Sequence, residues 1–168
     1  MNIWGNGTVS GTEDHDTIIG SGGPDNFSGL GGDDTLIGNE GDDTIDGGFG
    51  NDDLAGSAGA DLLIGGDGDD TFHFHTRFSG VDTVQDFDTK ADRILIYDDS
   101  STTIGTDIDW SFVKGGKNDA VDEPTVIYQK KSGKLFYDDD GKGGDSAQLL
   151  AKISDDLKVK ANDFDVIG

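Results

Sequence analysis

The chain has 168 residues and a formal net charge of −23, with 28 glycines, two prolines and no cysteine. A chain this acidic repels nucleic acid and anionic membrane surfaces, and the lack of cysteine excludes a disulfide framework. No apolar run approaches the roughly 20 residues of a membrane span, and the first residues lack the basic and apolar regions of a signal peptide.

Seven nonapeptides run without a gap from Gly11 to His73, each of the form Gly-x-x-Gly-x-Asp-x-apolar-x. The sixth position is always aspartate, and these residues are candidate metal ligands: Asp16, Asp25, Asp34, Asp43, Asp52, Asp61 and Asp70. The eighth position is always apolar: Ile18, Phe27, Leu36, Ile45, Leu54, Leu63 and Phe72. Residues 1–10 keep part of this register but have Gly7 in the aspartate position, so we expect an N-terminal cap that binds no metal.

A period of nine matches neither the helical repeat of 3.6 nor the simple alternation of a strand. It predicts a coil in which positions one to six form a glycine-rich turn and positions seven to nine form a short strand, with the eighth side chain pointing inward. Two nonapeptides would complete one winding, and successive windings would stack by parallel strand pairing at roughly 4.8 Å.

The charges of the repeat region require a counter-ion. Residues 1–74 hold sixteen acidic side chains and no lysine or arginine. Stacked windings would bring these carboxylates close together, at a cost on the order of 1 kcal/mol per pair even in high dielectric. Aspartate carboxylates and backbone carbonyls are all oxygen donors, which favour Ca²⁺ over Mg²⁺ or Zn²⁺.

The repeat resembles that of the RTX (repeats-in-toxin) proteins, most closely at Gly47–Ala55 and Gly65–His73. The resemblance implies an all-β fold, a right-handed parallel β-roll, with calcium held between loops two repeats apart. Asp16 would then face Asp34, and four further pairs would follow along the chain. The resemblance also implies carbonyl ligands, for which the fourth-position glycines are the candidates: Gly23, Gly32, Gly41, Gly50, Gly59 and Gly68.

Three loops depart from the repeat pattern. Asp14 replaces the fourth-position glycine of the first loop, and Pro24 and Ala60 replace the usual Asp or Asn at the fifth position. Asp16, Asp25 and Asp61 are therefore weaker candidates than the other four sixth-position aspartates.

After Phe74 the composition changes, because residues 74–168 carry all twelve basic residues. We expect a mostly antiparallel β region, 74–168, that caps the roll 11–73. Its expected strands are Phe72–His75, Val81–Phe87, Arg93–Tyr97 and a hairpin of Thr125–Tyr128 and Lys134–Tyr137 that turns near Ser132 and Gly133. Ala147–Ile153 suits a strand or a short helix, and we favour the strand.

This tail resembles the C-terminal flanks of RTX proteins exported by type I systems, including serralysin-like proteases. The matching segments are Asp82–Phe87 with Asp92–Ile94, Leu135–Gly141 and Asn162–Ile167. The resemblance implies an uncleaved C-terminal export signal, the type I secretion machinery as a partner and an extracellular, bacterial location. The alternative is that Phe164–Ile167 is simply the last strand of the cap.

Smaller groups of residues have competing interpretations. Asp82 and Asp86 are candidates for a last calcium site at the end of the roll, or for solvated carboxylates on a strand edge. Asp138–Gly143 resembles an EF-hand loop but has Leu149 at the twelfth position, which favours an acidic turn. His73 and His75 share a strand face without an evident third ligand, which favours surface histidines.

The sequence contains no His-Glu-x-x-His, Gly-x-Ser-x-Gly or phosphate-loop motif. We therefore expect a non-catalytic calcium-binding module that folds when it meets calcium outside the cell. Two alternatives are a polysaccharide- or surface-binding module that uses Trp4 and Trp110, and an auxiliary module of a larger secreted protease or polysaccharide-modifying enzyme.

Overall fold

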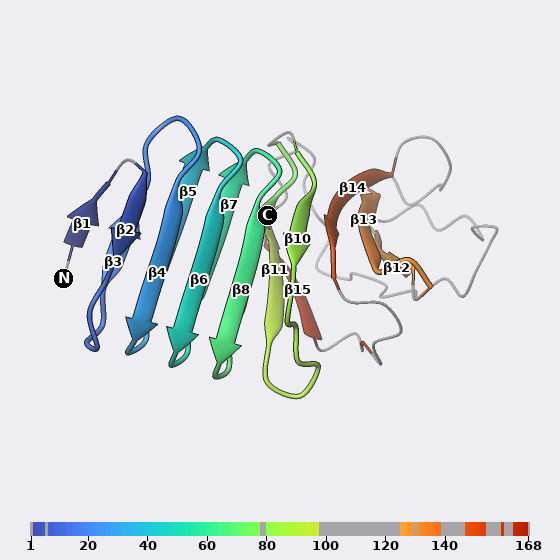
Figure 1. The fold of residues 1–168 in the computed structure, drawn as a ribbon. Helices are drawn as coiled ribbons and strands as arrows, with labels where there is room; N and C mark the ends of the chain where they lie inside the picture. The colour runs from blue at the N-terminus through green and yellow to red at the C-terminus, as the bar shows by residue number, and fades with distance from the viewer. Residues whose placement is uncertain are drawn as a thin grey trace.

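The computed structural model describes residues 2–5, 7–77, 80–97, 125–129, 131–138, 147–153, 159 and 163–167. Within these residues the chain forms two facing β-sheets that run the length of the molecule (Figure 1). The first sheet has the order β1 (Asn2–Trp4), β3 (Thr17–Ile19), β5 (Thr35–Glu40), β7 (Asp53–Ala58), β9 (Thr71–His75), β11 (Arg93–Tyr97) and β15 (Phe164–Ile167). The second has the order β2 (Thr8–Ser10), β4 (Asn26–Gly31), β6 (Thr44–Phe49), β8 (Leu62–Asp67), β10 (Asp82–Val84), β14 (Gln148–Lys152), β13 (Lys134–Asp138) and β12 (Thr125–Gln129).

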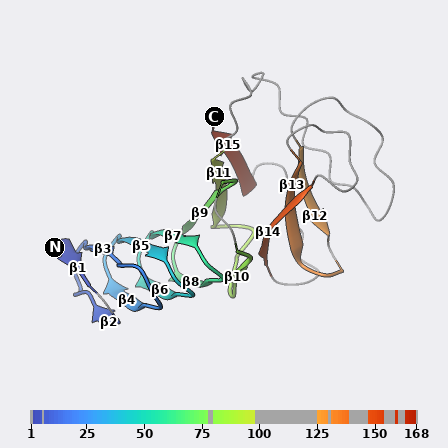
Figure 2. The same ribbon diagram turned by 90° about the horizontal axis from the view of Figure 1, so that it is seen from above.

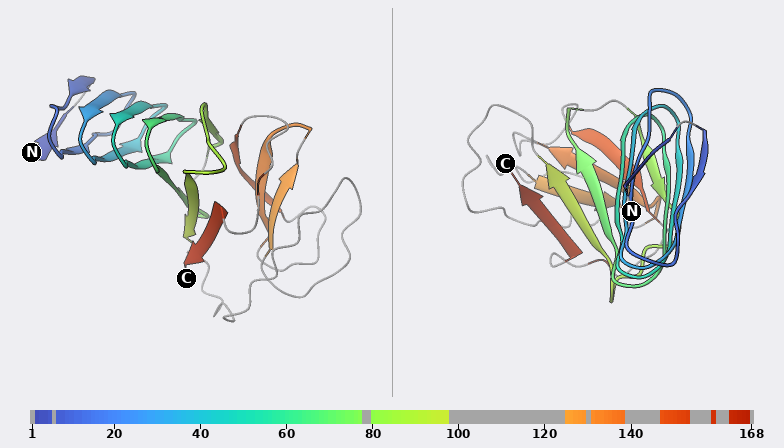
Figure 3. Two further views of the ribbon diagram at one scale, coloured as in Figure 1. Left: turned by 90° about the horizontal axis from the view of Figure 1, so that it is seen from below. Right: turned by 90° about the vertical axis from the view of Figure 1, so that its left-hand side faces the viewer.

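Strands of the repeat region alternate between the two sheets, so each winding takes one strand from each. Neighbouring strands of a sheet are parallel and offset by eighteen residues, as when Thr17 pairs with Thr35 and Thr35 with Asp53. Seen from the N-terminal end, the windings superimpose as nested loops (Figure 3, right). The prediction of a parallel β-roll with two nonapeptides per winding is confirmed.

The core of the roll is a thin layer of the eighth-position side chains. All seven are fully buried, from Ile18 to Phe72. The same layer continues beyond the repeats through Val84 and Ile94 into the C-terminal strands, where Tyr128, Leu135 and others complete it. The alternation of inward apolar and outward polar residues predicted from the sequence therefore holds along the whole roll.

The strands are longer than the sequence predicted. From β4 to β8 each strand has six residues and continues through the third position of the next nonapeptide, so the turn occupies only positions four to six. The first-position glycine is thus an inward-facing strand residue. At Gly47 an added Cβ would collide with Oδ2 of Asp52 and lie 2.6 Å from the carbonyl oxygen of Gly65, which explains why only glycine fits there.

The C-terminal strands extend the two sheets of the roll. β10 pairs in parallel with β8, β11 pairs in parallel with β9, and β15 pairs in parallel with β11. Beyond them, β12, β13 and β14 form the antiparallel region, with the predicted turn at residues 131–133 and the predicted strand, not a helix, at β14. Figure 2 shows this antiparallel region beyond the end of the roll.

Candidate metal centre

The turns place the seven sixth-position aspartates in two rows, one along each edge of the roll, at the upper and lower turns of Figure 1. One row precedes strands of the first sheet and contains Asp16, Asp34, Asp52 and Asp70. The other precedes strands of the second sheet and contains Asp25, Asp43 and Asp61. All seven side chains are at most 4% exposed. The sequence predicted both the rows and their spacing.

Within each row one carboxylate oxygen of every aspartate after Asp16 accepts an N–H from the preceding winding. The N–H of Asp16 donates to Oδ1 of Asp34 at 2.7 Å, and the N–H of Asp34 donates to Oδ1 of Asp52 at 2.8 Å. The same bond joins Asp25 to Asp43, Asp43 to Asp61 and Asp52 to Asp70, at 2.8 to 3.0 Å. We call this series the aspartate ladder. It fixes each carboxylate in the gap between two stacked turns.

The second carboxylate oxygen divides the repeats into two groups. In the first two repeats, Oδ2 of Asp16 accepts the N–H of Thr12 at 2.7 Å, and Oδ2 of Asp25 accepts the N–H of Ser21 at 2.9 Å. In the other five repeats Oδ2 is buried and has no hydrogen-bond partner: Asp34, Asp43, Asp52, Asp61 and Asp70. A buried carboxylate oxygen without a partner is costly, so these five positions call for a cation.

The backbone of the second position accounts for this division. In the last five repeats φ is positive there: 75° at Leu30, 78° at Asn39, 104° at Gly48, 77° at Ser57 and 97° at Gly66. In this conformation the N–H of the second residue does not donate to Oδ2, whereas Thr12 and Ser21 do donate. The chain therefore holds five carboxylate oxygens away from its own donors.

Burial shifts the titration of the ladder. It raises the pKa of Asp43, Asp52 and Asp70 to about 6, and it also raises the pKa of Asp34 and Asp61. The N–H bonds from the preceding windings oppose this shift, while neighbouring carboxylates such as Asp61 beside Asp43 add to it. Without a cation, the turns are an unfavourable place for negative charge.

Backbone carbonyls supply further oxygen atoms beside three of the unpartnered carboxylates, those of Asp34, Asp43 and Asp52. A Cβ added at Gly29 would collide both with Oδ2 of Asp34 and with the carbonyl oxygen of Gly47 in the next winding, so these two oxygens border the same small space. At Gly38 the corresponding oxygens are Oδ2 of Asp43 and the Gly56 carbonyl, the latter 2.8 Å from the added Cβ. A carboxylate and a carbonyl at one position suit a hard cation such as Ca²⁺.

The six fourth-position glycines that the sequence suggested as carbonyl ligands all have positive φ, between 93° and 158°. The carbonyls of all but Gly68 lie against the next turn of the same row: a Cβ added at Gly41 would be 2.6 Å from the oxygen of Gly23. Among the described residues, no three His, Cys, Asp or Glu side chains converge on one point. Any cation in these turns therefore depends on backbone oxygens as well as carboxylates.

The structure separates Asp82 from Asp86. Asp82 joins the ladder, because its Oδ1 accepts the N–H of Asp61 at 3.0 Å. Asp86 lies outside it and is exposed, with its two oxygens accepting the N–H groups of Gly65 and Gly66 at 3.0 and 2.9 Å. Sequence reasoning missed Asp92, whose Oδ1 accepts the N–H of Asp70 at 3.1 Å. The spacing Asp92-x-Ile94, which matches positions six and eight, could have revealed it.

The remaining candidates lie apart from the ladder. His73 Nε2 lies 3.0 Å from Oδ1 of Asp53, and both His73 and His75 stack on Tyr97. Trp4 is 76% exposed on β1. Trp110 and residues 139–146 lie outside the described part of the chain. No described segment forms a helix long and apolar enough to cross a bilayer.

The family of RTX calcium-binding nonapeptide repeats matches residues 3–36, 19–54 and 46–75. Residues 3–75 are RTX repeats. Calcium is thus the ion that these repeats bind, and the stacked turns carry five buried carboxylate oxygens without a hydrogen-bond partner. The matched range includes β1 and β2, so the imperfect first winding belongs to the same repeat block.

Among solved structures, the chain is similar to the R3 subunit of the mannuronan C5-epimerase AlgE6 from Azotobacter vinelandii, determined in solution. The two are 24% identical, the match covers 95% of this chain and 82% of that one, and the TM-score is 0.32. At this TM-score nothing about the function of this chain follows from the likeness. No curated protein matches the chain.

Proposed function

We propose that this protein is a non-catalytic calcium-responsive module whose RTX roll folds when Ca²⁺ binds between its stacked turns. The observation that carries the proposal is the set of five buried Oδ2 atoms without a hydrogen-bond partner, at Asp34, Asp43, Asp52, Asp61 and Asp70. These oxygens would hold the cations together with backbone carbonyls, such as that of Gly47 beside Asp34. Asp16 and Asp25 would contribute less, because N–H donors already occupy their Oδ2 atoms.

The repeat region combines a large negative charge with little buried apolar surface. Residues 1–74 carry sixteen acidic side chains and no lysine or arginine, while each nonapeptide buries only one large apolar side chain. Chain entropy, which is high for glycine-rich segments, and repulsion between carboxylates both oppose folding. Bound Ca²⁺ removes the repulsion, so the free energy of binding becomes free energy of folding.

Calcium-dependent folding also suits export of the chain in an unfolded state. At the low free calcium of a bacterial cytosol the roll would remain expanded, and an expanded chain can pass a narrow channel of the type I secretion machinery. Extracellular modules bind calcium with dissociation constants of roughly 10⁻⁴ to 10⁻³ M, so millimolar calcium outside the cell would fold the roll. We place the folded module outside the bacterial cell, with the resemblance of the C-terminal flank to exported RTX proteins as support.

A calcium titration followed by far-UV circular dichroism tests the proposal. The wild-type chain should gain β signal with Ca²⁺ and not with Mg²⁺. The gain should be cooperative, because each folded winding templates the next. Asp43→Asn should require more calcium. Asp33→Asn is the matched control, since Asp33 occupies the exposed fifth position of a neighbouring turn. A fully folded spectrum of the wild-type chain in excess chelator would refute calcium-dependent folding.

A further inference from the structure

The aspartate ladder continues past the last nonapeptide. Asp82 follows Asp70 by twelve residues, and yet it takes the place that a sixth-position aspartate would occupy above Asp61. The N–H of Thr83 donates to the carbonyl of Asp61 at 2.7 Å, as the N–H of Leu62 does to that of Asp43 at 2.8 Å. Gly80, Asp82 and Val84 therefore occupy positions four, six and eight of a further repeat unit that lies outside the gapless series of nonapeptides.

The turn before Asp82 has the same backbone as the turns of the repeats. Gly80 has φ of 131°, close to the 129° of Gly41 and the 149° of Gly59. An added Cβ at Gly80 would collide with the carbonyl of Gly59, just as one at Gly59 would collide with the carbonyl of Gly41. Gly80 and Asp82 thus form a Gly-x-Asp turn stacked on that of Gly59 and Asp61.

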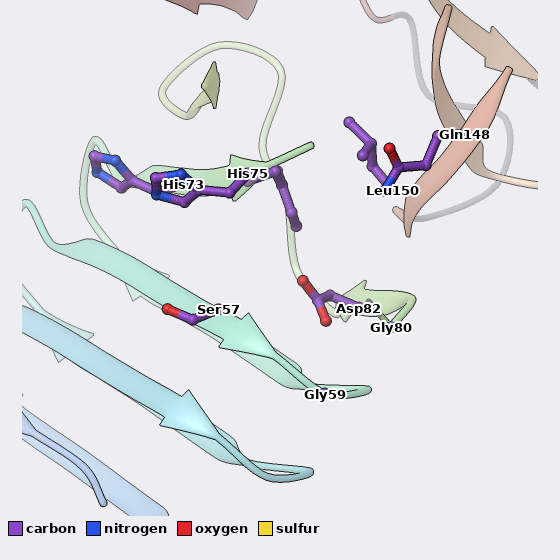
Figure 4. Close-up of a pocket in the computed structure, with 9 residues that line it drawn as sticks. Ser57, Gly59, His73, His75, Gly80, Asp82, Gln148 and Leu150 are labelled. Carbon is purple, nitrogen blue, oxygen red and sulfur yellow. The ribbon is translucent and has the colours of Figure 1, made fainter. Parts of the chain in front are cut away.

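Two buried oxygen donors meet at this junction. Oδ2 of Asp61 has no hydrogen-bond partner and its residue is 2% exposed, while Asp82 is 7% exposed. A cavity of about 10 Å³ adjoins Asp82; Ser57, His75 and Gln148 also line it, whereas Asp61 does not (Figure 4). A space of this size is enough for a single water-sized occupant.

We propose that Asp82, outside the nonapeptide repeats, shares with Asp61 the divalent cation at the last turn of its row, and that this cation fastens the C-terminal β region to the roll. The inference rests on the proposed calcium function of the ladder. The fastening follows from strand pairing, because Asp82 lies opposite Ala151 and Thr83 lies opposite Lys152 in β14. A cation on Asp82 would thus sit on β10, the strand that lies between β8 of the roll and β14 of the cap.

The Asp92 turn, which ends the other row, differs in one respect. Oδ2 of Asp92 accepts the N–H of Asp88 at 2.7 Å, four residues earlier, as Oδ2 of Asp25 accepts the N–H of Ser21. Its carboxylate is thus satisfied by its own turn on one oxygen and by Asp70 on the other. The inference is therefore confined to Asp82.

The competing explanation is a proton in place of the cation. Burial raises the pKa of the Asp82 carboxyl to about 7, with the charge of Asp61 adding to the shift. A protonated Asp82 could donate to Asp61 and so relieve the repulsion without metal. The Asp82→Asn variant separates the two explanations, because asparagine mimics the neutral acid and not the metal-binding carboxylate.

Native mass spectrometry of the full chain in calcium counts the bound ions. We expect Asp82→Asn to bind one Ca²⁺ fewer than the wild-type chain, and Asp86→Asn, a change in the same loop but outside the ladder, to bind the same number. Hydrogen exchange gives a second readout: in Asp82→Asn the amides of β14 should lose their calcium-dependent protection, while those of β5 keep it.

An unchanged calcium count in Asp82→Asn would overturn the inference. If that variant does not fold, a crystal structure of the wild-type chain grown in calcium decides: metal density at Asp82 supports the inference, and its absence there overturns it. A wild-type chain that binds no calcium would refute the proposed function itself. Calcium loss in Asp43→Asn with none in Asp82→Asn would refute only the junction site.

Discussion

Ser21 donates its backbone N–H to Oδ2 of Asp25 at 2.9 Å. The equivalent bond is missing in the next repeat, where φ of Leu30 is 75° and Oδ2 of Asp34 is left buried without a partner. One backbone dihedral angle at the second position thus separates turns that satisfy their own carboxylate from turns that need a cation. The repeat pattern of the sequence does not reveal this difference.

Removing a ladder carboxylate should weaken calcium binding most where Oδ2 has no partner. We expect Asp43→Asn to raise the calcium midpoint of folding about tenfold, because a charged ligand is lost from a site built of few donors. Asp25→Asn should shift it less, since Thr44 and Ser21 still hold that turn. Isothermal titration calorimetry of both variants measures the difference, and equal shifts would contradict the division into two groups.

Protons should partly replace calcium in neutralising the carboxylates of the aspartate ladder. The folded-state pKa of Asp43, Asp52 and Asp70 is raised to about 6 from an unfolded value of 3.8, so the folded chain binds more protons between these values. In metal-free buffer the roll should therefore gain stability as pH falls from 7 through 6 towards 4, and lose it as pH rises. Far-UV circular dichroism of the metal-free chain across this range measures the folded fraction and its slope with pH. Replacing all three aspartates with asparagine should flatten it, and a slope of the opposite sign in the wild-type chain would contradict the prediction.

Leu30→Gly should stabilise the roll. A leucine with φ of 75° carries a penalty of about 1 kcal/mol that glycine does not, and Leu30 is 41% exposed, so little buried surface is lost. We expect a gain in the free energy of unfolding of up to about 1 kcal/mol, measured by urea unfolding in saturating calcium. Leu30→Ala is the control for the lost side chain and should show no gain. A gain in the alanine variant as large as in the glycine variant would rule out backbone strain as the cause.

Gly47→Ala should be strongly destabilising, because its Cβ would press against Oδ2 of Asp52 and against the backbone of Gly65. Overpacking of this kind costs about 1–3 kcal/mol, and calcium affinity should fall with it. Gly22→Ala is the matched control: its Cβ would meet only the flexible Glu40 side chain at 3.4 Å, and φ is not positive. A calcium titration followed by circular dichroism compares the two, and a Gly47→Ala roll as stable as Gly22→Ala would contradict the close packing of the first position.

Much of the roll could be predicted from the sequence because its information is local and repeated. The apolar residue at every eighth position, Ile18 to Phe72, predicted the buried layer, and the aspartate at every sixth predicted two rows of carboxylates. Strand length could not be predicted in the same way. The glycines of positions one to three suggested a turn, whereas the need for space beside carboxylates such as Asp52 places a glycine in the strand itself.

By itself, the sequence determined the period of nine, the winding of two nonapeptides and the excess of negative charge that requires a cation, since each depends only on residues near one another in the chain. Only the tertiary structure decided which carboxylate oxygens lack a donor and that Asp82 and Asp92 continue the two rows. Their irregular spacing hides them from any periodic pattern. Parallel pairing of β10 on β8 and of β11 on β9 brings them into register, and such pairing joins segments that are distant in sequence.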